Sequence, residues 1–323
     1  MNKVLKRILI ALPVALVLVI AVVVISSYFE HRSLVEQEKA EFPAPGTLAH
    51  VDGSNLHVYA EGPAAADGND AIGRPTLVFL SGLGTASPVF DFRPLYRRLS
   101  DDYRIVVVER AGYGWSDITD SPRDLDTVLY ETRSALQLAG ETPPYILLPH
   151  SLAGLEAIHW ATQHPDEVTS IIGLDPLVPE YREHDDDAPA FPATVIFLAR
   201  SGLMRNSPDV FRDNFPAAQH GLLSQQDAAA AEAVFFRRLF SRNMRAEADM
   251  IDANARTVLQ QPEPSVPFHA FISTSNENEH WSRVLAERAR RSGGQYYLVD
   301  ADHYIHIDAL DTVSAEIRTL IAD

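Results

Sequence analysis

The chain has no cysteine among its 323 residues and no lysine after Lys39. The lack of cysteine excludes thiol catalysis, thiolate metal sites, disulfides and a lipid-modified cysteine anchor. The formal net charge is −17, which disfavours nucleic acid as a partner because phosphate binding needs a clustered positive surface. The nucleotide-binding spacings G-x-x-x-x-G-K-S/T and G-x-G-x-x-G are absent as well. Apolar and charged contents of 46% and 22% are ordinary for a globular enzyme.

The first 28 residues predict a membrane anchor. Three basic residues precede an unbroken apolar run over residues 8–28, and the next charge is Glu30. Roughly 20 residues at about 1.5 Å rise each match a hydrocarbon core of about 30 Å. The basic residues before the run predict a cytoplasmic N-terminus, with the rest of the chain on the extracytoplasmic (periplasmic) side.

A cleaved signal peptide is the alternative interpretation of this segment. The apolar region of a signal peptide is usually about 7–15 residues long and ends in a small-x-small cleavage site. Here the run is longer, and Val24-Ile25-Ser26 is a poor cleavage site. We therefore favour an anchor that stays attached, with membrane contact through residues 8–28.

A linker and a β-hairpin are predicted next. Residues 29–46 mix charge with proline and glycine, as linkers do. The folded domain is expected to begin near Thr47. Two short alternating runs, Thr47–Val51 and Asn55–Ala60, are separated by Asp52-Gly53, which is a hairpin signal.

Apolar strands then alternate with helical patterns. Strands are predicted at residues 76–80, 103–109, 145–148 and 168–174, and helices at 91–99, 121–139 and 152–164. Such alternation requires crossover connections, and hence a mostly parallel sheet with helices on both faces.

The alternation stops between residues 176 and 264. Helical stretches such as 226–240 and 244–259 dominate there, with a strand considered only at 194–198. The pattern then resumes with strands at 268–273 and 295–299 and helices at 280–291 and 312–321. We therefore expect one α/β core, residues 47–175 and 265–323, and a helical lid over 176–264, inserted after the sixth strand.

The strongest chemical signal is Ser151, at the point where the strand ending in Pro149 meets the next helix. A serine in this position sits on a tight turn with its hydroxyl above the sheet. The small residues Ala153 and Gly154 suit that turn, whereas Pro149 stands where glycine is usual. The alternative role for Ser151 is a simple helix N-cap.

Four segments in this order resemble α/β-hydrolases. They are LVFLSGLGTAS (77–87), VVVERAGYGWSD (106–117), LLPHSLAGLEA (147–157) and DADHYIHIDALDTV (300–313). They look most like membrane-anchored or exported bacterial members that carry SGLG and RAGYGWSD in place of the commoner HG and RPGxGxS. The resemblance implies an α/β-hydrolase fold and a serine nucleophile, and it covers roughly residues 47–175 and 266–323.

The resemblance also implies an oxyanion hole and a histidine base. The N–H groups of Leu83 and Leu152 would receive the developing oxyanion. His303, between the last strand and the last helix, matches the position of the family's base, whereas His306 does not. His150, beside the nucleophile, is interpreted as packing or hydrogen-bonding support.

The acid of the triad is left open between two positions. In most of the family it follows the strand after the lid, where Glu277 is the best-spaced candidate and Glu279 the next. In some members it ends the strand before the lid, which here is Asp175. We favour Asp175 and keep Glu277 as the alternative. The acidic run over 185–187 is interpreted as a solvated loop, and Glu109, Arg110 and Asp117 as structural.

The sequence therefore predicts a serine hydrolase acting on a small-molecule ester or amide, with a carboxylesterase as the default. A proline-releasing aminopeptidase and an acyltransferase with the same triad are alternatives. A non-catalytic binding protein on a hydrolase scaffold is an alternative of another class. No metal and no organic cofactor is required, and the sequence does not name the substrate.

Overall fold

The computed structural model describes residues 3–63, 75–183, 191–207, 209–275 and 278–322. One eight-stranded sheet has the order β1-β2-β4-β3-β5-β6-β7-β8. The strands are β1 (Thr47–Val51), β2 (Ser54–Glu61), β3 (Thr76–Leu80), β4 (Arg104–Glu109), β5 (Tyr145–Pro149), β6 (Val168–Leu174), β7 (Phe268–Ser273) and β8 (Tyr296–Val299).

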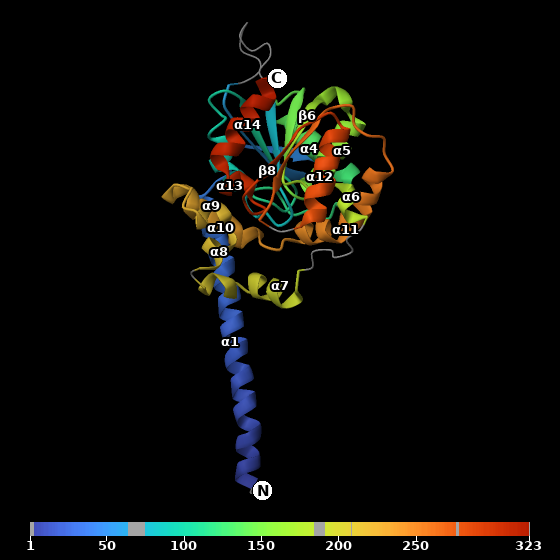
Figure 1. Cartoon of the computed structure of the whole chain (residues 1–323). Coiled ribbons are helices and arrows are strands. Elements are labelled where there is room, and N and C mark those ends of the chain that lie inside the picture. Colours follow the sequence, from blue (N-terminus) through green and yellow to red (C-terminus); the bar gives the residue numbers. More distant parts are fainter. Residues whose placement is uncertain (1–2, 64–74, 184–190, 208, 276–277, 323) are drawn as a thin grey trace.

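Helices surround this sheet and one long helix projects from it (Figure 1). They are α1 (Lys3–Glu41), α2 (Pro88–Asp91), α3 (Arg93–Tyr96), α4 (Leu125–Leu138), α5 (Ala153–Gln163), α6 (Pro179–Arg182), α7 (Ala193–Arg200), α8 (Val210–Asn214), α9 (Pro216–Gln219), α10 (Gln225–Arg238), α11 (Arg242–Leu259), α12 (Glu279–Arg291), α13 (Ile305–Asp308) and α14 (Leu310–Ala322). Two short 3₁₀ turns are η1 (Pro165–Glu167) and η2 (Leu203–Asn206).

The predicted hairpin is confirmed. β1 and β2 pair antiparallel, and Asp52 and Gly53 between them both have positive φ, 45° and 83°. Positive φ at both turn residues gives a turn whose twist matches that of the strands. β2 also pairs antiparallel with β4, and every later pair from β4 to β8 is parallel.

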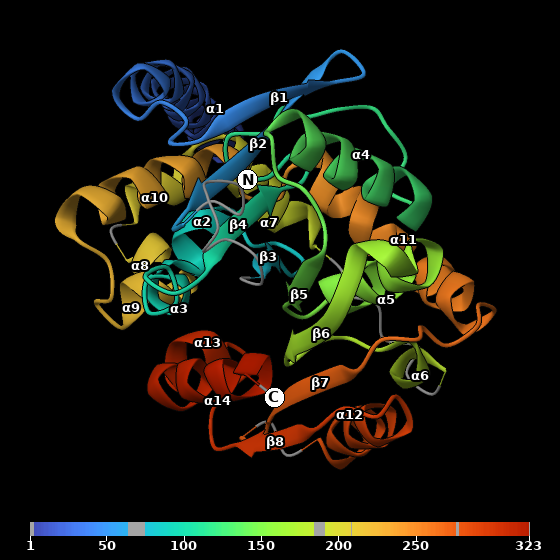
Figure 2. The same ribbon diagram turned by 90° about the horizontal axis from the view of Figure 1, so that it is seen from above.

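The parallel strands are buried on both faces. In β3 every residue is buried, and alternate side chains enter two different cores. Val78 and Leu80 pack with the side chains of α4, α5 and α12, whereas Leu77 and Phe79 pack with those of α3 and α14. Figure 2 shows these two sets of helices on opposite faces of the sheet. Burial on both faces explains the continuous apolar runs in the sequence.

The chain between β6 and β7 is helical as expected. One prediction inside this insertion and one in the α/β core are wrong. Residues 194–198 lie within helix α7 and form no strand, because a short apolar run fits either structure and tertiary context decides. The helix expected from residue 121 begins at Leu125, since the Asp124 side chain accepts a hydrogen bond from the Thr127 N–H and caps it there.

The insertion has its own aromatic core. Phe211, Phe215 and Phe235 pack together and reach Tyr113 and Phe90 of the α/β core. The helix predicted at 91–99 is shorter than expected: α3 covers only Arg93–Tyr96 of it, and α2 lies just before it. The insertion therefore rests on the loops at the carboxyl ends of the strands, where a site of this fold would lie.

Helix α1 runs without interruption from Lys3 to Glu41, so most of the segment predicted as a linker is helical. Its last turns are tied to the insertion. Arg205 of η2 donates two hydrogen bonds to the Glu38 carboxylate, at 2.6 and 2.8 Å, and a third to His31 Nδ1 at 2.9 Å. The preceding apolar part is 6% buried and is long enough to cross a membrane.

Candidate active site

Ser151 lies on a strained turn between β5 and α5. Its φ is 52°, in the left-handed region that a residue with a Cβ rarely adopts. The turn is held on both sides: the His150 N–H donates to the Leu80 carbonyl at 2.9 Å, and the Leu177 N–H donates to the Ser151 carbonyl at 2.7 Å. Pro149 ends β5, so its missing N–H removes no interior hydrogen bond from the sheet. The turn thus lifts a partly exposed serine above the carboxyl ends of the strands.

The loop after β3 passes directly beside this serine. A Cβ added at Gly82 would lie 2.8 Å from the Ser151 Cβ and 3.0 Å from His150 Nδ1, so only glycine fits there. The backbone N–H groups of Leu83 and Leu152 donate to no residue within the part of the chain that the structure describes. These two are the N–H groups that the sequence predicts for the oxyanion hole, and both are free to bind a ligand oxygen.

Asp175 and His303 are brought together from segments 128 residues apart. His303 Nδ1 lies 2.6 Å from Asp175 Oδ2. The Asp175 side chain is fully buried, and its Oδ1 accepts hydrogen bonds from the Ser273 N–H at 3.0 Å and from Trp281 Nε1 at 2.8 Å. Asp175 also has a positive φ of 48°. The His303 side chain is 39% exposed, so the ring can reach a substrate while the carboxylate stays dry.

His306 belongs to a different pair. Its Nε2 lies 2.9 Å from Asp91 Oδ2, and both side chains are buried. The sequence separates His303 from His306 only by position, whereas the structure gives each its own carboxylate. His306 therefore ties α13 to α2 below the surface, whereas the His303 side chain is partly exposed.

His150 connects the serine turn to the histidine loop. Its Nε2 lies 3.1 Å from the His303 carbonyl oxygen, and its ring is 4.7 Å from the His303 ring. Burial lowers the pKa of His150 well below its usual range, and the nearby His303 and His306 lower it further. A neutral His150 with its proton on Nε2 donates to the His303 carbonyl and holds that residue in place.

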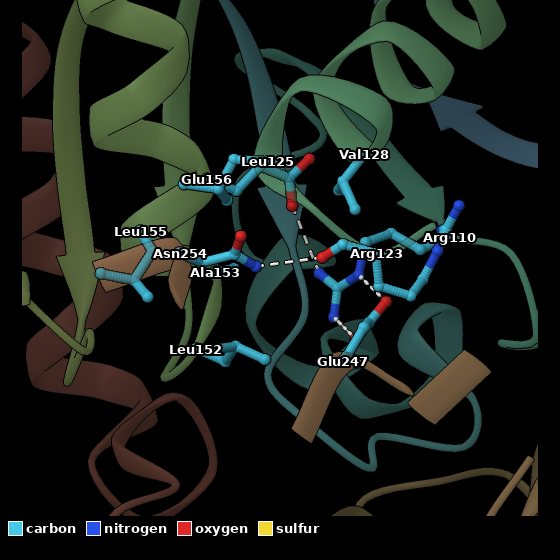
Figure 3. A pocket seen from close by; sticks show the side chains of 10 residues that line it. All are labelled: Arg110, Arg123, Leu125, Val128, Leu152, Ala153, Leu155, Glu156, Glu247 and Asn254. Carbon is cyan, nitrogen blue, oxygen red and sulfur yellow. Dashed lines mark hydrogen bonds and ion pairs between the residues drawn. The ribbon is translucent and has the colours of Figure 1, made fainter. Parts of the chain in front are cut away.

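A buried ion cluster supports the loop after β3 from beneath. Arg110 donates to the Ser81 carbonyl at 2.8 Å. It also donates to both oxygens of Glu247 at 3.1 Å, and its Nη1 lies 3.4 Å from Glu156 Oε2 (Figure 3). Burial opposes the charge of Arg110, but Glu247, Tyr113 and Glu156 raise its pKa well above the usual value. The cluster borders a cavity of about 20 Å³ that also touches Leu152. Because Glu247 lies on α11, it joins the insertion, through Arg110, to the loop after β3.

The GYGWS turn is arranged around Glu109. This buried carboxylate lies 2.9 Å from His57 Nδ1 and accepts from the Trp115 N–H at 2.8 Å. A Cβ at Gly114 would lie 1.6 Å from the Glu109 carboxylate, so the turn requires glycine. Asp117 accepts from the Asn55 N–H at 2.8 Å. These contacts fit the structural roles expected from the sequence.

Two of the sequence predictions fall outside the described residues, namely Glu277 and the acidic run over 185–187. Among the residues that are described, no group of three or more His, Asp or Glu side chains could hold a metal ion. Sequence reasoning missed Trp281, Asp91 and Glu247. None of them has a local sequence signal, because each meets its partner only through the tertiary fold.

Comparison with known proteins places this geometry in a family. The family model of the alpha/beta hydrolase fold matches residues 75–261. The chain is 33% identical over 297 residues to the uncharacterized protein YbdG of Bacillus subtilis, covering 88% of this chain and 85% of that protein. It is 37% identical over 97 residues to a pimeloyl-[acyl-carrier protein] methyl ester esterase of Xanthomonas oryzae, covering 30% and 35%.

Solved structures agree on the fold. The enol-lactonase from Burkholderia xenovorans superimposes with a TM-score of 0.59 at 18% identity, over 85% of this chain and 99% of that one. The eight-stranded mostly parallel sheet, with helices on both faces and a helical insertion after β6, is the arrangement expected from the sequence. The chain belongs to the α/β-hydrolase fold family.

Proposed function

We propose that this hydrolase acts through a serine nucleophile on an ester-like carbonyl, as a carboxylesterase does. Ser151 is the nucleophile, His303 the base and Asp175 the acid. The observation that carries the proposal is the 2.6 Å contact between His303 Nδ1 and the buried Asp175 carboxylate, on the same sheet edge as the strained Ser151.

Each group has a defined role in the first half of the reaction. Asp175 holds the proton of His303 on Nδ1, which leaves Nε2 free to accept the Ser151 proton. The serine oxygen then bonds to the carbonyl carbon of the substrate, and the carbonyl oxygen becomes an oxyanion. The N–H groups of Leu83 and Leu152 stabilise that oxyanion. Removing one such donor from an oxyanion hole typically costs about 3 kcal/mol of transition-state stabilisation.

The second half regenerates the enzyme. His303 gives its proton to the leaving alcohol as the carbon–oxygen bond breaks, which leaves an acyl group on Ser151. Water then loses a proton to His303 and bonds to the acyl carbon. The bond between that carbon and the serine oxygen breaks, the acid leaves, and His303 returns the proton to Ser151. Asp175 stays ionised throughout and balances the charge of the imidazolium.

The same three groups would serve an aminopeptidase or an acyltransferase, so the acceptor and the leaving group distinguish these activities. A peptide or aminoacyl substrate would release an amine, and a competing alcohol would yield a new ester. A binding protein on the same scaffold would be stabilised by ligands without turnover. Product analysis with simple p-nitrophenyl esters, aminoacyl amides and added alcohols separates the four outcomes.

We infer further that α1 anchors the domain in a membrane, with the N-terminus in the cytoplasm. Its long apolar surface is left uncovered by the protein, and the basic residues precede that surface. Resistance of the full chain to carbonate extraction, together with its full length by mass spectrometry, would support the anchor. A shortened mature chain would indicate a cleaved signal peptide.

The test of the catalytic proposal uses the full chain in detergent and a small fluorophosphonate probe. We expect an adduct on Ser151, located by peptide mass spectrometry, that disappears in Ser151→Ala and falls sharply in His303→Gln. The exposed His50 provides a matched control, and His50→Gln should label like the wild type. Absence of labelling on a folded wild-type chain would contradict the proposal and favour the binding protein.

A further inference from the structure

Where the insertion meets α1, the protein forms a pocket of about 420 Å³. Its wall includes four arginines: Arg200 of α7, Arg237 of α10, and Arg242 and Arg245 of α11. His31 of α1 and Ser241 complete the polar part of the wall, and no carboxylate is among the lining residues. This concentration of positive charge stands out in a chain whose formal net charge is −17.

The positive charge of the pocket is only partly balanced. Arg242 pairs with Asp120, and Arg237 donates to the Gly114 carbonyl at 3.3 Å. The buried Nε atoms of Arg237 and Arg245 have no hydrogen-bond partner among the described residues. These two N–H donors would gain a partner from an anion in the pocket.

The charges around each of these arginines act in both directions. Burial lowers the pKa of Arg245, Arg200 and Arg242 lower it further, and Asp249 opposes them. Burial also lowers the pKa of Arg237, against the more distant carboxylates Glu109, Glu38 and Glu36. The positive charges of these arginines therefore lie close together, and no carboxylate lines the pocket to neutralise them.

The pocket lies at a defined depth relative to α1. The apolar run ends at Tyr28, and His31, which lines the pocket, follows three residues later. At about 1.5 Å per residue this is about 4.5 Å farther along the helix. The headgroup layer of a bilayer adds roughly 5–8 Å on each side of the hydrocarbon core. If α1 spans a membrane as proposed above, the pocket opens within the headgroup layer.

Helix α7 adds an apolar surface at the same level. Phe197 and Leu198 are 53% and 39% exposed, and Arg200 follows them in the pocket wall. Figure 1 shows α7 at the end of the domain from which α1 projects. The segment after α7 contacts α1 directly, since a Cβ at Gly202 would lie 2.8 Å from the Ser27 carbonyl oxygen. Exposed apolar side chains beside arginines are typical of a helix at a membrane surface.

We propose that this pocket binds a phosphate group, and that an anionic lipid headgroup of the surrounding bilayer supplies it. Four arginines line one pocket, and guanidinium groups donate well to the oxygens of a phosphate. The depth of the pocket and the apolar face of α7 favour a lipid over a soluble anion. The lipid source rests on the proposed membrane anchor, whereas the phosphate site depends only on the pocket itself.

The test measures lipid retention by the full chain in a neutral detergent, using native mass spectrometry. Phosphatidylglycerol should bind at least tenfold more tightly than zwitterionic phosphatidylcholine. Arg200→Gln combined with Arg245→Gln should weaken phosphatidylglycerol binding roughly tenfold or more, as expected for the loss of charge-assisted contacts. The matched control combines Arg97→Gln with Arg256→Gln.

The control removes the same charge from exposed arginines outside the pocket, and Arg256 lies on α11 like Arg245. The control should bind like the wild type. Equal binding by both double variants, equal loss in both, or equal affinity for the two lipids would overturn the lipid site. Unchanged melting temperatures, measured in parallel, separate lost binding from lost folding.

A second experiment distinguishes a lipid phosphate from a free phosphate. It also separates failure of the proposed anchor from failure of the phosphate site. Inorganic phosphate and glycerol 3-phosphate are titrated against the same variants. If they bind as tightly as phosphatidylglycerol, and only the pocket variant loses them, the site takes a free phosphate and the lipid source is wrong. If the chain is also released by carbonate extraction, the anchor fails while the phosphate site stands.

Discussion

Replacing Asp175 with asparagine changes a single atom of a buried side chain and reverses one hydrogen bond of the proposed triad. The Ser273 N–H and Trp281 Nε1 both donate to Asp175 Oδ1, so the asparagine carbonyl must stay on that side. The amide NH₂ is then forced toward His303 Nδ1, which lies 2.6 Å from Oδ2 in the wild type. Two donors cannot share that contact.

We expect the His303 imidazole to change tautomer in this variant. Nδ1 becomes the acceptor and the proton moves to Nε2, where it blocks removal of the Ser151 proton. In serine triads this exchange lowers kcat by about 10⁴, which corresponds to about 5 kcal/mol of transition-state stabilisation. Asparagine tolerates the φ of 48° at this position, so the fold should be kept.

The assay is turnover of a short-chain p-nitrophenyl ester by the full chain in detergent, with the melting temperature measured in parallel. We expect kcat to fall by about 10³–10⁴ with little change in KM. Asp91→Asn is the matched control, since it makes the same change in the buried His306 pair and should keep kcat within a few-fold. Near-normal turnover by Asp175→Asn, with a collapse in Glu277→Gln, would refute the assignment.

Three further outcomes follow from the described contacts. Gly82→Ala should lower kcat at least 100-fold, because its Cβ would lie 2.8 Å from the Ser151 Cβ and displace the oxyanion loop; an active variant in the ester assay would argue against this loop. Arg110→Gln should lower the free energy of unfolding by about 3–5 kcal/mol, since Glu247 would be left buried without its cation; a urea titration checks this, and a loss below about 1 kcal/mol would contradict it. The depressed pKa of His150 means that the unfolded state binds its proton first as pH falls, so this residue's stabilisation is present above pH 6.5 and lost below it. His150→Phe should therefore flatten the stability decline between pH 6.5 and 5.5 by up to about 1 kcal/mol, and an unchanged decline would show that another group causes it.

Local patterns predicted most of the α/β core. The hairpin at Asp52-Gly53 follows from two residues that tolerate positive φ, and the buried strands follow from apolar runs that need cover on both faces. The turn at Ser151 was predictable because it depends on neighbours in the chain, Ala153 and Gly154 among them. These features share one property, namely that the residues responsible are close in sequence.

Predictions were weaker where the deciding contact is distant. The apolar run at 194–198 lies within α7 and forms no strand. A run this short is compatible with either structure, and its tertiary neighbours decide between them. The segment expected as a linker continues α1 to Glu41, with Arg205 bound to Glu38 across 167 residues. Composition and periodicity reveal neither the surroundings of residues 194–198 nor the pairing of Arg205 with Glu38.

The sequence by itself determined the chemistry available to the chain: no thiol, one serine at a strand–helix junction, and candidate histidines near the C-terminus. Only the tertiary structure decided how these groups pair. It joined His303 to Asp175 and His306 to Asp91, because strand order and crossover connections place distant loops at one edge of the sheet. It also gathered four arginines beside α1, although they lie on three separate helices. The sequence states which side chains are present. Which histidine meets which carboxylate depends on distances that only the folded chain defines.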